Sequence, residues 1–557
     1  MTDVTSRRSG PPGGGRGRGR GRGRASGSRT SPRSERGHAV PRLDRLDVVV
    51  AAALGVAALL LRVGGLTSGS LYRDDAWVAL AARTDLVTAS RLGLTIPGFA
   101  TFHALWGRMG GSSAWAQLPQ LAASVATVMA TYLVARRLRC DRVWALAGAG
   151  SIALSAQAIV FATRVKPYSM DSLSAVAVIA LACWVVQRPS GRRWLVFAVA
   201  NLLAAVWSAS VVPVTTAATA WAAWRCLRID RSRRAAPPGP ADAPVASTGV
   251  WWWNPAVIVL SVHLALLAVA ATVIGRATPP PLHDSWNPNY VDDLEQAWRI
   301  AGALAEGLFH RGGSFGAVVL VAAATVVVWR RPRLAGLLVG PTVLAFALAA
   351  ASRVPLGGGR IDIYLYPSLA LTLAVAAQEI GEPLLSAWPR RATTTLVASG
   401  LVAIALVSTR HVLERSPYPG SDMADLVRSV DEARGSGDGV VVAPYSRFAY
   451  ANAAAPDPTI VISERYSTRF TVSSPDPDVF ILPAEYYETG YDPDAALRFA
   501  RHHERIWYIA TDTPPSDTLP ALQAYEYEPE DRIIAAGYRV ERTIRVRGAH
   551  ADLLVPV

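Results

Sequence analysis

The sequence predicts a polytopic α-helical membrane protein with about eleven transmembrane helices and a C-terminal extracytoplasmic α/β domain. Three observations predict this fold class. Apolar segments long enough to cross a bilayer recur between residues 47 and 408. Arginine gathers in the short loops between alternate segments. After residue 409, the chain changes to short helical and strand-like patterns.

Composition supports the membrane class. Hydrophobic residues make up 51% of the 557 residues and charged residues 18%, which is more apolar than a soluble protein of this size needs. The formal charge of +14 is uneven: residues 1–42 hold eleven arginines against two acids (+9), and residues 416–557 hold thirteen against twenty-two (−9). This distribution orients a membrane protein and does not indicate a nucleic-acid partner.

The chain divides into three predicted parts. Residues 1–42 are mainly Gly, Arg, Ser and Pro, cannot form a core, and are expected to be a disordered cytoplasmic tail. Residues 43–410 hold the spans, and residues 411–557 hold the outer domain. Arg-Gly tracts bind RNA in some proteins, but beside a first span a tail attracted to anionic lipid is favoured.

The first span, at 47–66, begins with Asp47, contains one further charge, Arg62, and is long enough to be retained in the membrane. Short amphipathic helices at 76–82 and 92–109 are expected to lie at the interface. Further spans are predicted at 114–135, 143–162, 169–186, 194–209, 212–227, 255–274, 315–329, 334–351, 361–377 and 393–408.

Loop charge sets the predicted orientation. The arginine-rich loops fall on the side that the N-terminus occupies, so the positive-inside rule places this side in the cytoplasm. We expect a multi-pass protein of the plasma membrane. The first outer loop then carries Asp74 and Asp75, and an odd number of spans places everything after residue 409 outside.

The C-terminal part shows helical pattern at 422–433 and strand-like runs at 440–442, 459–462, 479–482, 506–509 and 538–546. It contains no glycine motif that cradles phosphate. Aromatic residues gather there, and we expect them to stack on acceptor sugars. The alternative is that they fill the core. These aromatic residues are Tyr486, Tyr487, Tyr491, Trp507, Tyr508, Tyr525 and Tyr527.

Polar residues that could carry chemistry lie in the predicted outer loops. They are Asp74, Asp75, His103, Arg164, Lys166, Tyr168, Arg360 and Tyr364. Lys166 is the only lysine in the chain. This suggests that the position requires a compact positive charge, which an ammonium group can place on a phosphate oxygen. The alternatives are that this lysine arose by chance, that the two acids only cap a helix, and that His103 only packs at the interface.

Several motifs, in order, resemble a known family. They are Asp74-Asp75-Ala76-Trp77, then Gly111-Ser112-Ser113 leading to Leu118-Pro119, then Arg164-Val165-Lys166-Pro167-Tyr168, and finally Gly359-Arg360 with Tyr364. Over residues 45–410 the chain resembles the GT-C fold polyprenyl-phosphate-sugar glycosyltransferases, in the family 39 protein mannosyltransferase-like group. It departs from the family at Asp75, where glutamate is usual.

The resemblance implies an inverting transfer of a sugar from a polyprenyl-phosphate carrier to an acceptor hydroxyl of a glycan, lipid or protein. It assigns Asp74 as general base and Asp75 as its orienting partner, or both as ligands of an optional divalent cation. Lys166, Tyr168, Arg360 and Arg164 would then bind the donor phosphate. The residues fit this chemistry, because a base and cations are what such a transfer needs.

Two other classes remain open at this point. A transporter or lipid flippase would also be polytopic, but would place ionisable residues near the middle of its spans, and the predicted spans show no acid there. A non-catalytic scaffold whose outer domain binds cell-wall polymer is the third reading. The sequence names neither the sugar nor the acceptor.

Overall fold

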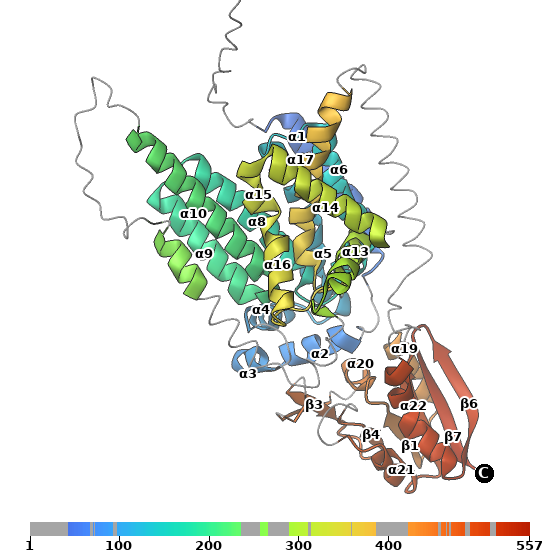
Figure 1. The fold of residues 1–557 in the computed structure, drawn as a ribbon. Helices are drawn as coiled ribbons and strands as arrows, with labels where there is room; N and C mark the ends of the chain where they lie inside the picture. The colour runs from blue at the N-terminus through green and yellow to red at the C-terminus, as the bar shows by residue number, and fades with distance from the viewer. Residues whose placement is uncertain are drawn as a thin grey trace, which may run out of the picture. The chain divides into compact units, whose positions relative to one another are not determined.

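The elements of the protein are drawn in Figure 1. The computed structural model describes residues 43–66, 71, 73–92, 97–235, 255, 257–265, 289–309, 313–357, 359–385, 422–454, 458–463, 465–466, 469–484, 491–512 and 520–557. The predicted tail at 1–42, the predicted span at 393–408 and the pair Tyr486–Tyr487 lie outside these residues.

Long apolar helices confirm a polytopic membrane protein. Within the described residues, five helical segments are long and apolar enough to cross a membrane: α1 (Arg45–Val63), α5 (Ser113–Arg137), α8 (Tyr168–Gln187), α14 (Gly313–Arg330) and the segment Ile363–Pro383, which joins η5 (Ile363–Leu365) to α17 (Tyr366–Leu385). Two bent pairs raise the number to as many as seven. One is α6 (Arg142–Leu154) with α7 (Ala156–Val160) and η1 (Phe161–Thr163); the other is α15 (Pro332–Leu338) with α16 (Gly340–Ala350).

Other helices occupy further predicted spans. These are α9 (Gly191–Trp207) and, after η2 (Ala209–Val211), α10 (Val212–Ala235). Only the first half of the predicted span at 255–274 is described, and α13 (Leu294–Phe309) follows it. The count of eleven therefore stays a prediction, whereas the helical membrane fold is confirmed.

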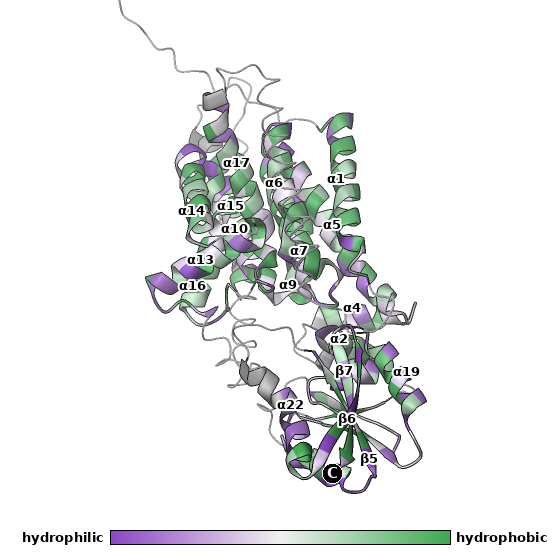
Figure 2. Ribbon diagram, turned by 90° about the vertical axis from the view of Figure 1, so that its right-hand side faces the viewer, coloured by the Kyte–Doolittle hydropathy of each residue, from purple (hydrophilic) through white to green (hydrophobic). Residues whose placement is uncertain are grey.

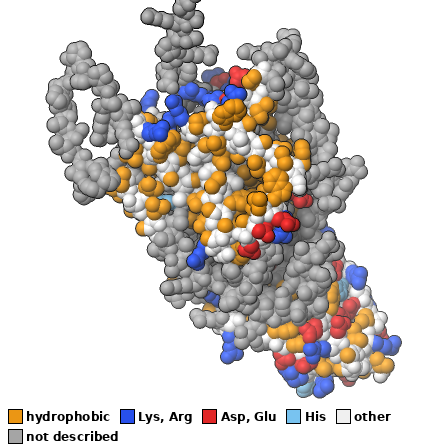
Figure 3. Space-filling model, in the orientation of Figure 1, with side chains coloured by type: hydrophobic (Ala, Val, Ile, Leu, Met, Phe, Trp, Pro, Cys, Tyr) orange, Lys and Arg blue, Asp and Glu red, His pale blue; other side chains and the backbone are white. Residues whose placement is uncertain are grey.

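Hydropathy agrees with this division. The helices of the bundle are largely hydrophobic in Figure 2. In the space-filling view, hydrophobic side chains form a belt across the visible face of the bundle, and basic side chains gather along its upper edge (Figure 3). Such a belt is what the hydrocarbon layer requires of a helical protein.

The charge inside the first span has a structural explanation. Arg62 is buried and donates to the carbonyls of Ile152 and Ala153, each at 3.0 Å, and to Ser124 Oγ at 2.8 Å. These carbonyls lie where α6 and α7 meet at an angle of 58°, and the helix break leaves such groups without their usual partners. Arg62 thus stabilises the bend.

Short helices follow the first span at the predicted interfacial positions. They are α2 (Arg73–Ala82), α3 (Leu86–Arg91) and α4 (Pro97–Gly107). Helix α2 packs against α4 on one side and against α20 (Arg447–Ala453) of the C-terminal part on another. Ala76, Val78 and Leu80 of α2 share one buried apolar cluster with Phe448 and Phe470.

The C-terminal part is an α/β domain, as predicted. Its five-stranded sheet has the order β4-β1-β5-β7-β6, in which β1 pairs in parallel with β4 and β5, and β7 pairs antiparallel with β5 and β6. The strands are β1 (Asp438–Val442), β4 (Val479–Ile481), β5 (Arg505–Thr511), β6 (Tyr538–Val546) and β7 (Ala549–Pro556). A separate antiparallel pair joins β2 (Thr459–Ile462) to β3 (Phe470–Ser473).

Within the described residues, the helices of this domain are α20 and three others: α19 (Met423–Ala433), α21 (Asp494–Ala500) and α22 (Pro520–Ala535). The β1–β5 register pairs Val440 with Trp507 and Val441 with Tyr508, so these aromatic side chains alternate between the two faces. Both are buried in the core. The expectation that Trp507 and Tyr508 stack on sugars is therefore wrong, and the alternative reading holds for them.

Candidate active site

The two acids occupy the first turn of α2, where negative charge opposes the helix dipole. Capping alone would leave both in solvent, but their surroundings differ. The Asp75 side chain is only 1% exposed, and that of Asp74 is 25% exposed. Adjacent positions on a helix point about 100° apart, which separates the two carboxylates into a buried one and a reachable one.

Asp75 forms a buried ion pair with Arg164. Its Oδ2 accepts from Arg164 Nε at 2.6 Å, while the buried Oδ1 has no hydrogen-bond partner within the part of the chain that the structure describes. Burial raises the pKa of Asp75, although the charges of Arg164 and Lys166 act to lower it. Asp75 is thus a carboxylate that is shielded from water and has a hydrogen-bond partner for only one of its two oxygens.

Asp74 faces a second arginine. Its Oδ2 accepts from Arg360 Nη1 at 3.2 Å, and both side chains are partly exposed. Arg360 comes from the loop before η5, nearly three hundred residues away in the chain. The fold therefore brings together the first and last motifs of the predicted site.

Lys166 lies within the same group. Its ammonium lies 3.7 Å from the ring centre of Trp77, which is on α2 two positions after Asp75. This is a cation–π contact. Burial lowers the pKa of Lys166 to about 8, although the Asp74 and Asp75 carboxylates raise it. A lysine of this kind is charged at neutral pH and has little water around it.

The Arg360 loop is held by a residue to which the sequence analysis gave no role. Asp362 Oδ2 accepts from the backbone N–H of Gly357 at 2.8 Å and of Gly359 at 3.2 Å, and both glycines have positive φ, +80° and +72°. Burial raises the pKa of Asp362 to about 7, against the hydrogen bonds from Gly359 and Gly357. Asp362 thus fixes the backbone on either side of position 358, directly before Arg360.

Three further predicted residues lie around this group. Tyr168 begins α8 and interacts electrostatically with Asp74, Asp75, Arg164 and Arg360, so it belongs to the cluster. Tyr364 is 1% exposed, interacts electrostatically with Asp362, and its hydroxyl finds no hydrogen-bond partner among the described residues.

His103 is also buried, and its Nε2 lies 2.6 Å from the Gln120 side-chain amide. Swapping the oxygen and nitrogen of that amide lets Gln120 accept from the ring and donate to the carbonyls of Ala116 and Gln117. Burial lowers the pKa of His103 to about 4, so the ring is neutral at physiological pH. Its position is that of a packing residue at the edge of the cluster.

The residues present do not fit a divalent cation. Among the described residues, no group of three or more His, Cys, Asp or Glu side chains could hold a metal ion. Asp74 and Asp75 each face an arginine, whereas Mg²⁺ and Ca²⁺ require several oxygen ligands. No step of the reaction is therefore derived through a metal.

Comparisons with known proteins identify the architecture. No protein-family model and no curated protein sequence matches the chain. Among solved structures, ArnT from Cupriavidus metallidurans in the apo state superposes with a TM-score of 0.51 at 13% identity, over 91% of this chain and 97% of that one. The chain has the GT-C fold.

Two other GT-C structures are more distant. An archaeal oligosaccharyltransferase, AglB from Archaeoglobus fulgidus, gives a TM-score of 0.46 at 12% identity over 89% of this chain and 73% of that one. Arabinosyltransferase EmbB from Mycobacterium smegmatis gives 0.37 at 14% identity over 60% and 30%. The fold of this chain rests on the ArnT superposition and on its own helices.

Proposed function

We propose that this chain is a membrane glycosyltransferase that moves a sugar from a polyprenyl-phosphate donor to an acceptor hydroxyl, with inversion at the anomeric carbon. The observation that supports it most is the convergence of Asp74 and Asp75 with Arg164, Lys166 and Arg360 in a GT-C fold. A transfer of this kind needs a base on one side of the reacting carbon and positive charge on the other.

Asp74 acts as the general base. Its carboxylate is the more exposed of the two, so an acceptor hydroxyl can reach it. As the hydroxyl oxygen bonds to the anomeric carbon, its proton passes to Asp74, and the bond from that carbon to the phosphate oxygen breaks. Base catalysis of this type contributes roughly 10² to 10⁴ in rate.

The cations stabilise the departing phosphate. The electron pair of the broken bond goes to the phosphate oxygen. The phosphate diester thereby becomes a monoester and gains negative charge. Lys166 and Arg360 offer that charge a point cation and a guanidinium, and the Tyr168 hydroxyl can donate to it. Arg164 binds Asp75 and acts mainly by fixing the position of α2.

The outer domain supports the acid-bearing helix. Because α20 packs on α2, removing residues after 415 would uncover Ala76 and Leu80. We therefore expect a truncated chain to lose donor hydrolysis as well as transfer. If the domain only bound the acceptor, its removal would abolish transfer and leave donor hydrolysis intact.

Orientation and compartment follow from the loop charges. The arginine-rich loops support an orientation with the N-terminus in the cytoplasm and with α2 and the C-terminal domain outside the plasma membrane. The partners are then the polyprenyl-phosphate sugar, membrane lipid, and a cell-envelope glycan, lipid or protein as acceptor.

The test uses purified protein in detergent with polyprenyl-phosphate sugars extracted from the cells' own membranes. The wild-type chain should release polyprenyl phosphate in the absence of any gradient or sealed compartment. A transporter or flippase would leave the donor intact under these conditions. Intact donor with the wild-type chain would refute the proposal.

A further inference from the structure

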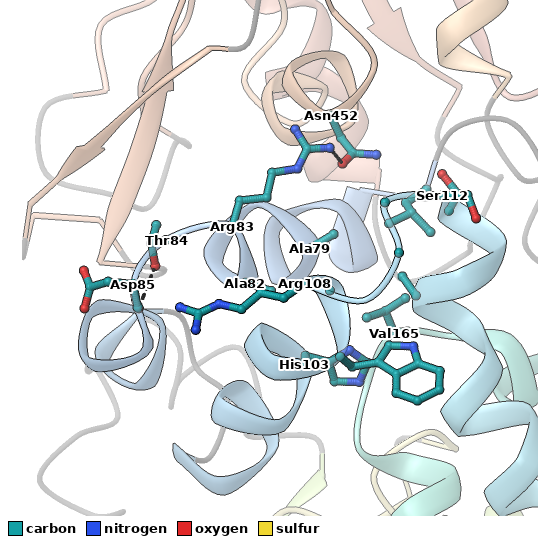
Figure 4. Close-up of a pocket in the computed structure, with 17 residues that line it drawn as sticks. Ala79, Ala82, Arg83, Thr84, Asp85, His103, Arg108, Ser112, Val165 and Asn452 are labelled. Atoms are coloured by element: carbon teal, nitrogen blue, oxygen red, sulfur yellow. Dashed lines mark hydrogen bonds between the residues drawn. The ribbon is translucent and has the colours of Figure 1, made fainter.

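A cavity of about 460 Å³ lies beside the acid-bearing helix (Figure 4). Its walls come from the second half of α2, the end of α4, the loop that leads into α5, Val165, and Asn452 of α20. This volume falls within the roughly 300–1,000 Å³ of small-molecule sites. Of the predicted site residues, the described lining includes His103 and none of the acids or donor cations.

The cavity abuts the reacting groups. Ala79 lines it and follows Asp75 by four residues, so both lie on one face of α2, about 6 Å apart along the axis. Val165 lines it too, and lies between Arg164 and Lys166. A molecule in the cavity therefore lies beside the face of α2 that carries Asp75, without occupying the place of the donor phosphate.

One wall is rigid and aromatic. Trp106 lines the cavity and stacks on Trp115, with ring centres 4.4 Å apart and planes within 4°. Each indole N–H donates to the other residue's carbonyl, at 2.8 and 3.0 Å. Phe102 also stacks against Trp106, with ring centres 6.1 Å apart and planes within 16°. The indole is thus held by two rings, and the part of it that lines the cavity offers a sugar ring contact area at little entropic cost.

Polar side chains line other parts of the cavity, beside apolar residues such as Leu71, Ala79 and Val165. Arg83 reaches from α2 to Asn452, whose Oδ1 accepts from Arg83 Nη2 at 2.9 Å (Figure 4). Arg108 is exposed at the end of α4, and Ser113 opens α5. Hydroxyl, amide and guanidinium groups around an aromatic surface match a molecule rich in hydroxyl groups, whereas a polyprenyl chain needs an apolar wall.

We propose that this cavity binds the acceptor, and that the acceptor is a glycan whose terminal sugar packs against Trp106 while one hydroxyl reaches toward the acids. This rests on the proposed glycosyl transfer and adds to it the class of acceptor. Because Asn452 belongs to α20, the C-terminal domain contributes directly to acceptor binding as well as supporting α2.

The test separates acceptor binding from donor chemistry. Ser113→Trp fills the cavity, and Arg108→Glu reverses a charge at its exposed end. Their matched controls are Ala114→Trp, at the adjacent half-buried position that does not line the cavity, and Arg501→Glu, at an exposed arginine of the C-terminal domain. Each variant is assayed for donor hydrolysis by purified protein, using the cells' own polyprenyl-phosphate sugars.

Each variant is also expressed in cells whose own copy of the gene has been deleted, and the sugar linkages of the envelope glycans are measured. We expect both cavity variants to lower the restored linkage by about tenfold or more while donor hydrolysis stays within about twofold of wild type, and the controls to restore it fully. Full restoration by both cavity variants, or a parallel loss of linkage and hydrolysis, would overturn the acceptor assignment. A wild-type chain that neither hydrolyses donor nor restores a linkage would instead overturn the proposed function.

Discussion

Two buried aspartates, Asp75 on α2 and Asp438 in the C-terminal domain, each pair with an arginine, but burial and pairing shift their pKa values in opposite directions. Asp438 accepts from Arg505 Nε at 2.8 Å and Nη2 at 2.9 Å, and also from the Gly435 N–H at 2.8 Å. Burial acts to raise the pKa of Asp438. The hydrogen bonds from Arg505 and Gly435 and the charge of Arg505 together outweigh burial, so the pKa is lowered. Asp75 has a single bond to Arg164 and a pKa that burial raises.

We interpret this difference as that between a structural pair and a pair that belongs to the proposed active site. Both oxygens of Asp438 have partners, so this pair fastens the loop before β1 to β5 and has nothing left to offer a ligand. Asp75 keeps one buried oxygen without a partner, which costs stability and is tolerated mainly at functional sites. The variants below test this contrast, beginning with the largest expected effect on activity.

Asp75→Asn should lower donor hydrolysis by about 100-fold, because a neutral amide cannot form the ion pair with Arg164 and holds α2 less firmly relative to the cations. The protein should still be extracted and purified in normal yield, since removing a desolvated charge offsets part of the lost ion pair. Steady-state kinetics with the polyprenyl-phosphate donor measure the effect. Near-normal turnover would mean that Asp75 is only a helix cap.

Asp362→Asn should lower turnover by about 10- to 100-fold through Arg360, because both glycine N–H groups donate to one oxygen, Oδ2, and an amide oxygen accepts such bonds more weakly than a carboxylate does. A positioning role predicts that Asp362→Asn has little further effect in an Arg360→Ala background. A double-mutant cycle on kcat/KM measures this coupling. Additive losses would show that Asp362 acts on the fold and not through Arg360.

The pH profile should report Lys166. With a pKa of about 8, its positive charge is complete below that pH and is lost as pH rises through it, so kcat/KM should fall on the alkaline side. Lys166→Arg keeps its charge, and although it should lower activity by a few-fold, its alkaline limb should move to higher pH. The same alkaline limb in both proteins would assign that limb to another group.

Asp438→Asn should leave activity per folded molecule unchanged, because the Asp438 pair lies in the C-terminal domain away from the cations. It should destabilise that domain by about 2 kcal/mol, the scale of a lost charge-assisted hydrogen bond. Limited proteolysis and thermal unfolding measure the destabilisation. A loss of activity like that of Asp75→Asn would remove the contrast between the two pairs.

Local patterns were enough to predict the helical membrane fold, the α/β domain and the residues of the charge cluster. Long apolar runs and motif order carry that information along the chain. The role of Asp362 could not be read in this way, because its partners are backbone N–H groups whose direction depends on positive φ at Gly357 and Gly359. Nothing near Tyr364 in sequence indicates that its hydroxyl is buried.

Contacts between residues far apart in the chain could not be predicted from the sequence either. The bond from Arg83 to Asn452 joins residues 369 positions apart, and the cover of α2 by α20 depends on the same long-range approach. Arg62 is an example within the membrane. The sequence shows only a charged residue in an apolar segment, and it does not show that Arg62 donates to carbonyls at the break between α6 and α7.

Single-turnover release of polyprenyl phosphate by wild type, Asp74→Asn and Asp74→Glu tests the central claim most directly. The asparagine variant keeps the shape of the side chain and removes the base, so release should fall by roughly 10² to 10⁴, whereas glutamate should retain part of the rate. Circular dichroism and detergent stability should match wild type in both. Wild-type release by a folded Asp74→Asn protein would contradict the assignment of Asp74 as the general base.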